Sequence, residues 1–115
     1  MSDYQQRFAK FCAKFQGYED VVQRMVGMFI QDAPVRLAQA KDGSESRDWE
    51  AVIKAAHSLV NIAGTMQAFE VAELARKMEA AARARSYDEF AQLCDAVQLE
   101  LDSILAVLAS SCDTN

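Results

Sequence analysis

The stretch DWEAVIKAAHSLVNIAGTM, residues 48–66, has apolar residues that recur with the spacing of an α-helix. Asp48 suits the N-cap position, so a helix is predicted from about Asp48 to about Met66. With Ile53 set at zero and a step of about 100° per residue, one side of this helix is strongly apolar. The core-facing residues are Val52, Ala56, Leu59, Ile62, Ala63 and Met66. Trp49, Ile53 and Val60 widen the apolar arc to roughly 200°, more than the ~100° that a surface helix needs.

His57 is the only histidine of the chain, and it lies at the edge of this arc, about 40° from Ile53 by the helical repeat. A polar flank lies beyond it, made by Glu50, Lys54, Ser58 and Asn61. We expect Ile53 and Val60 to be partly exposed beside the imidazole, because a bundle buries only part of so wide an arc. Gly64, two turns after His57, would let a partner surface approach closely.

Helical periods also run through the rest of the chain, and no alternating strand pattern competes with them. A first helix is predicted to end at Gly17. Pro34 is expected to kink the second helix or to start its second half, and residues 41–44 are read as the stop and the loop after it. Two more helices are predicted, over about 68–85 and after a capping box at 86–89.

Long helices with short connections predict antiparallel neighbours. We therefore expect an all-α fold, an antiparallel up-down four-helix bundle with an additional short N-terminal helix. It is expected to form a single domain over residues 1–115, with its core at about 15–110. Supporting ion pairs are predicted at Glu73–Lys77 and Glu79–Arg83, and the methionines at 25, 28, 66 and 78 are expected in the core.

The charge and the cysteines disfavour several classes of protein. The 12 basic residues are scattered among 17 acidic ones, for a net charge of −5, which argues against nucleic-acid binding. No segment reaches the ~18 uncharged apolar residues of a membrane span, and the N-terminus lacks the form of a signal peptide. Cys12, Cys94 and Cys112 form no C-x-x-C motif, so a reducing compartment, the cytoplasm, is expected.

The chemistry of His57 is narrowed by what surrounds it. Zinc needs about four His, Cys or carboxylate ligands, and the i+4 residue is Asn61. A hydrolase triad needs a presented nucleophile and an oxyanion hole, for which the chain shows no motif. No Gly-rich phosphate loop is present, so the chain is not expected to use ATP. Two possibilities stay open: a surface histidine without a role, and an imidazole that accepts a phosphoryl group.

Several separated motifs point to one family. They are A-H-S-L at 56–59, A-G at 63–64 and L-A-x-x-M-E at 74–79, with F-I-Q-D-A-P at 29–34 and D-W-E-A at 48–51. Together they resemble the histidine-containing phosphotransfer (HPt) domain of bacterial multistep phosphorelays, over about residues 15 to 110.

The resemblance implies that His57 accepts a phosphoryl group from a receiver-domain aspartate and passes it to another receiver aspartate. It implies a carrier without autonomous ATP-dependent activity and without a cofactor of its own, since Mg²⁺ is held by the receiver. Its partners would be response-regulator receiver domains and a hybrid histidine kinase, and the domain would be a monomer. The docking face near His57 would include Ile53, Val60 and Gly64.

Three positions depart from the family pattern, which commonly reads H-x-L-K-G with a further Gly ten residues after the His. Val60, Asn61 and Gln67 stand there instead. Lys54 is a candidate to balance the phosphoryl charge, and Asn61 is a candidate neighbour of the phosphoryl group. Basic residues of the 68–85 helix are further candidates: Arg76, Lys77 and Arg83. The departures favour an alternative, a degenerate HPt-like adaptor that binds receiver or kinase domains without relaying phosphate. An unrelated helical interaction module is a third possibility.

Overall fold

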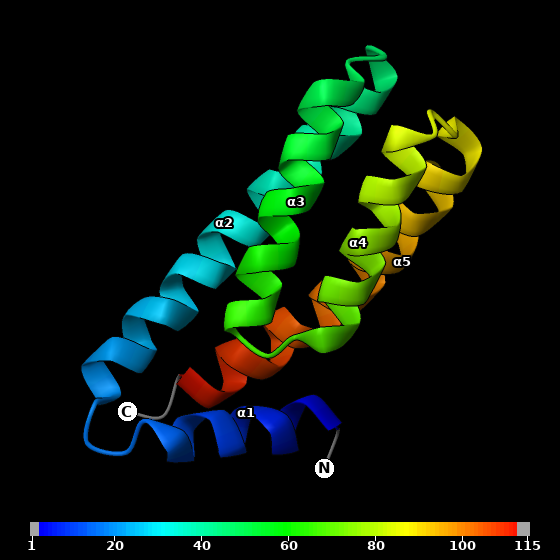
Figure 1. The fold of residues 1–115 in the computed structure, drawn as a ribbon. Coiled ribbons are helices and arrows are strands. Elements are labelled where there is room, and N and C mark those ends of the chain that lie inside the picture. Colours follow the sequence, from blue (N-terminus) through cyan, green and yellow to red (C-terminus); the bar gives the residue numbers. More distant parts are fainter. Residues whose placement is uncertain (1–2, 113–115) are drawn as a thin grey trace.

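The computed structural model describes the backbone of residues 3–112 and the side chains of residues 6–108. This part of the chain contains five helices and no strand. They are α1 (Asp3–Lys14), α2 (Glu19–Glu45), α3 (Trp49–Thr65), α4 (Phe69–Arg83) and α5 (Tyr87–Cys112). Each of the long helices packs on its neighbour in the chain, and α2 also packs on α5, which closes a four-helix bundle. In Figure 1, α1 lies across the end of the bundle near the C-terminal part of α5. The all-α up-down bundle with a short N-terminal helix is thus confirmed.

The three connections within the bundle are built alike. After α3, Ala68 N–H donates to Ala63 O at 2.8 Å and Gln67 N–H donates to Gly64 O at 3.0 Å, which is a Schellman motif. The residue at its centre, Gln67, has a left-handed φ of 57°. Arg47 and Arg85 hold the same place after α2 and α4, with φ of 61° and 55°. Because this motif reverses the chain within three residues, consecutive helices lie antiparallel.

The predicted loop at residues 41–44 is wrong, because α2 continues to Glu45. The helix ends at the left-handed Arg47 and not at Gly43. Gly43 is buried against α3, where an added Cβ would lie 2.9 Å from Val52 Cγ2. The glycine therefore serves close helix packing and not a helix stop. Pro34 lies inside α2, which continues on both sides of it.

The core combines apolar side chains from every helix. Trp49 at the start of α3 packs edge-on against Phe90 of α5, with ring centroids 6.1 Å apart. Cys94 is buried in this core, and the burial raises the pKa of its thiol to about 11. The largest fully buried side chains are Phe11, Phe29, Phe90, Leu37, Leu59, Met78 and Leu101. In the described helices, none is long and apolar enough to cross a bilayer.

Two details of the amphipathic faces differ from the sequence prediction. Ala55, outside the predicted core face, is buried, and Ile62, predicted in the core, is only half-buried and lines a hollow beside α2. On α4, Glu73 forms an ion pair with Arg76 at 3.2 Å and not the predicted pair with Lys77, since the arginine at i+3 lies within reach.

Candidate functional site

His57 lies on the solvent side of α3, next to α4. Its side chain is 63% exposed. Its Nδ1 is 3.3 Å from Oε1 of Glu79, which projects from α4. The antiparallel packing of α3 on α4 brings together these two residues, which are distant in sequence. The imidazole ring is therefore held by Glu79 on its Nδ1 side, and most of the ring faces solvent.

The charge state of Glu79 decides which ring nitrogen carries the proton. Oε2 of Glu79 accepts a 2.8 Å hydrogen bond from Nη2 of Arg83. This bond, and next to it the bond with His57, holds the pKa of Glu79 below its ordinary value. At neutral pH Glu79 is a carboxylate, which only accepts hydrogen bonds. Nδ1 of His57 is therefore the donor, and in the neutral ring Nε2 carries the lone pair that a phosphoryl acceptor needs.

The sequence predicted part of this cluster. The pair Glu79–Arg83 was expected from its i,i+4 spacing and is confirmed. The contact between Glu79 and His57 was missed, because no local spacing links residues on two different helices. The only available signal was that Glu79 ends the L-A-x-x-M-E motif.

The residues expected to dock a partner fall into two groups. Ile53 and Val60 are half-buried and pack against the core, so they are edge residues and not freely exposed anchors. Gly64 is exposed, and an added Cβ there would meet nothing within 4 Å. Asn61 is exposed too, and its backbone carbonyl accepts a 3.0 Å hydrogen bond from the Thr65 hydroxyl. The side chain of Asn61 points toward the same solvent side as His57 by the helical repeat.

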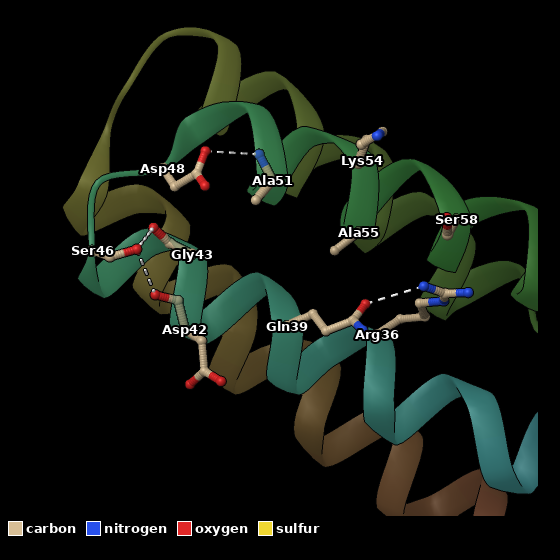
Figure 2. Close-up of a pocket in the computed structure, with 10 residues that line it drawn as sticks. All are labelled: Arg36, Gln39, Asp42, Gly43, Ser46, Asp48, Ala51, Lys54, Ala55 and Ser58. Carbon is tan, nitrogen blue, oxygen red and sulfur yellow. Dashed lines mark hydrogen bonds between the residues drawn. The ribbon is translucent and has the colours of Figure 1, made fainter.

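Lys54 lies one turn before His57 and, by the helical repeat, about 60° from it around α3, on the side nearer α2. Lys54 stands at the border of the gap between α2 and α3 (Figure 2). It lines an open hollow of about 570 Å³ between α2 and α3, and His57 is not among the residues that line it. The walls of this hollow are Arg36, Gln39, Asp42, Gly43, Ser46, Asp48, Ala51, Lys54, Ala55 and Ser58. Arg36 donates to Gln39 at 3.1 Å along the α2 wall. Lys54 therefore borders the hollow with its side chain outward (Figure 2), whereas His57 bonds Glu79 of α4.

A second, apolar hollow of about 180 Å³ lies on the same flank. It is lined by Met25, Met28, Phe29, Asp32, Ile62, Thr65 and Met66. Met28 is 62% exposed, so the prediction that it belongs to the core is wrong. Met66 and Met78 are buried as predicted. The flank of α3 that faces α2 is therefore hollowed along much of its length.

The comparisons with known proteins agree with this geometry. The family model of the Hpt domain matches residues 24–107, most of the chain. The chain therefore belongs to the Hpt domain family, whose members are phosphocarrier modules of phosphorelay signalling. Neither the curated proteins nor the solved structures contain a match. Within the described residues, no group of three or more His, Cys, Asp or Glu side chains is placed to hold a metal ion.

Proposed function

We propose that this Hpt domain is a phosphorelay intermediate. It accepts a phosphoryl group from a receiver aspartate on His57 and passes it to a second receiver aspartate. The observation that supports this most directly is the hydrogen bond of Nδ1 to the Glu79 carboxylate, which leaves Nε2 as the nucleophile on an exposed ring. The family match supports phosphotransfer as the general role.

The transfer needs no proton to move. The Nε2 lone pair forms a bond to phosphorus, the bond between phosphorus and the aspartate oxygen breaks, and the electron pair stays on the aspartate carboxylate. The Nδ1 proton remains in place, so the ring gains one positive charge as it gains the phosphoryl group. Glu79 faces that charge and stabilises it. The second transfer is the same step in reverse, with another aspartate as acceptor.

The partner is expected to approach over the exposed face of α3 around His57. A standard interface covers about 800 Å² on each partner, which is a disc of roughly 16 Å radius. Centred on His57, such a disc includes Gly64, about 10 Å away along the helix, and also Ile53 and Val60. Mg²⁺ is expected on the receiver and not on this chain. We expect the domain to act as a cytoplasmic monomer without ATP-dependent activity of its own.

The adaptor alternative rests on Val60 and Asn61, which replace the Lys and Gly common in the family. An adaptor has no need of a nucleophilic nitrogen facing solvent. The exposed ring and its carboxylate partner favour the relay.

The test is to mix the protein with a receiver domain charged from radiolabelled acetyl phosphate, and to measure label transferred to this chain. We expect acid-labile, base-stable label in the wild type and none in His57→Gln, with circular dichroism and melting unchanged because the ring is exposed. Binding of the receiver without label would establish the adaptor. Label that persists in His57→Gln would show another acceptor and refute the proposal.

A further inference from the structure

The carboxylate that holds His57 also holds a cation. Oε1 of Glu79 is 3.3 Å from His57 Nδ1, and Oε2 accepts from Arg83 Nη2 at 2.8 Å. Two hydrogen bonds to one carboxylate place the guanidinium within about 8 Å of the imidazole. Arg83 is 63% exposed, so packing does not fix its side chain.

A cation is needed here because phosphorylation adds roughly two negative charges to the ring. Glu79 is suited to the positive ring, but it repels the phosphoryl oxygens that arrive nearby. On α3, Val60 stands at the position where the family commonly has lysine, and Lys54 lines the hollow on the α2 flank. Within the described part of the chain, Lys54 makes no bond with the histidine or its carboxylate, whereas Arg83 of α4 is hydrogen-bonded to the same carboxylate as His57.

We propose that Arg83 is the group that balances the phosphoryl charge on His57, an inference that rests on the proposed function. The guanidinium has five N–H donors in a planar fork that matches phosphate oxygens. One of these donors bonds Glu79, which leaves four N–H donors for the phosphoryl group. Arg83 thus takes over the role of the missing lysine from a neighbouring helix.

The chain offers a matched control. Arg76 lies on the same helix, is similarly exposed and also pairs with a glutamate, at 3.2 Å. That glutamate, Glu73, makes its bond with Arg76, whereas Glu79 bonds both Arg83 and His57. Arg83→Ala and Arg76→Ala therefore make the same change in net charge, and only the first removes a cation that shares a carboxylate with the histidine.

The experiment uses phosphoramidate, a small phosphoryl donor, so that no protein partner is involved. The P–N bond of the donor breaks, a bond from Nε2 to phosphorus forms, and the leaving nitrogen takes up a proton as ammonia. His57 is the only histidine, so phosphorus NMR of phosphohistidine reports this site alone. The same spectra give the rate of formation and the lifetime of the phosphorylated form, at low and at high salt.

We expect Arg83→Ala to lower the rate and the lifetime about fivefold at low salt, the size expected of one partly solvated charge, with a smaller loss at high salt. Arg76→Ala should match the wild type, Arg83→Lys should recover part of the loss, and adding Val60→Lys to Arg83→Ala should recover much of it. The Arg83 Nε–H resonance should shift on phosphorylation, a response that a purely structural residue would not give.

Equal behaviour of Arg83→Ala and Arg76→Ala would overturn the role of Arg83 and leave the proposed function intact. A loss in Lys54→Ala with none in Arg83→Ala would assign the charge to Lys54 instead. Failure of the wild type to form phosphohistidine would count against the nucleophile itself, and so against both proposals.

Discussion

The two flanks of α3 are built differently. Toward α4, the flank is closed by charged side chains, with His57 and Arg83 on the carboxylate of Glu79. Toward α2, it opens into two hollows, one polar and one lined with methionines. The difference separates two tasks. On the α4 flank a carboxylate orients the imidazole and holds a cation near it, and on the α2 flank the hollows leave open space that, under the proposed function, a receiver could occupy.

The shape of the α2 flank depends on how closely α2 and α3 meet at one end, and a pair of glycines tests this. At Gly43 a Cβ would lie 2.9 Å from Val52 Cγ2 and 3.3 Å from the Asp48 carbonyl oxygen, whereas at Gly27 it would meet nothing within 4 Å. Gly43→Ala should lower the free energy of unfolding by about 1 kcal/mol, the cost of overpacking less the gain in helix propensity. Gly27→Ala should raise it by about 1 kcal/mol.

Urea unfolding of both variants measures this difference of about 2 kcal/mol between the two substitutions. Stabilisation by Gly43→Ala equal to that by Gly27→Ala would show that the two helices separate easily at this end. The hollow would then be a variable opening and not a fixed feature of the flank.

A second comparison asks whether the face of α3 around His57 receives the partner. Gly64→Gln adds a side chain in open space on the surface of α3, so the folded domain should tolerate it. Against a receiver seated over His57, the added side chain should clash and weaken binding about tenfold, or roughly 1.4 kcal/mol. Titration of the labelled domain with the receiver measures the loss.

Gly27→Gln is the control for that experiment, because Gly27 is equally unobstructed in the isolated domain. By the helical repeat it faces about 140° away from Asp32, which lines the second hollow, so binding should be unchanged. Equal losses in the two variants would mean that the receiver does not centre on α3.

The smallest effect belongs to the α4 flank and depends on pH. The pKa of Glu79 is lowered, by Arg83 first and by His57 next, from an ordinary value of 4.5. Its folded state binds fewer protons than its unfolded state, so its contribution to stability is present above pH 4.5 and is lost as pH falls through the folded pKa. Glu79→Gln should reduce the acid-induced loss of stability, by less than about 1 kcal/mol.

Urea unfolding of wild type and Glu79→Gln between neutral and acid pH measures this contribution. Glu70→Gln is a useful comparison, because Arg7 lowers the pKa of Glu70 at the contact of α1 with α4. Glu70→Gln should also reduce the acid-induced loss of stability, and it should leave the tautomer of His57 unchanged. Identical pH dependence in wild type and Glu79→Gln would show that the ion pairs of the α4 flank contribute nothing to folding.

The sequence alone determined the helices and the bundle, because apolar periodicity is a local property that survives in any packing of the chain. It also singled out His57 and placed it at the border of an apolar arc. It did not locate the end of α2, because glycine is the usual sign of a left-handed helix end and here Arg47 takes that conformation. Gly43 was taken for the end of the helix for the same reason. Its role is instead to let α2 approach Val52 of α3 closely.

The composition of the site was decided by tertiary structure. His57 meets Glu79 only because two antiparallel helices pack with one particular register, and a side-chain contact across that register has no signature in the spacing of either helix. The same packing brings Arg83 to the carboxylate that holds His57, a link that Lys54, three residues from His57 on its own helix, does not share. Electrostatic interactions depend on distance in space, so sequence could name the cations of this domain but could not show which of them lies beside the histidine.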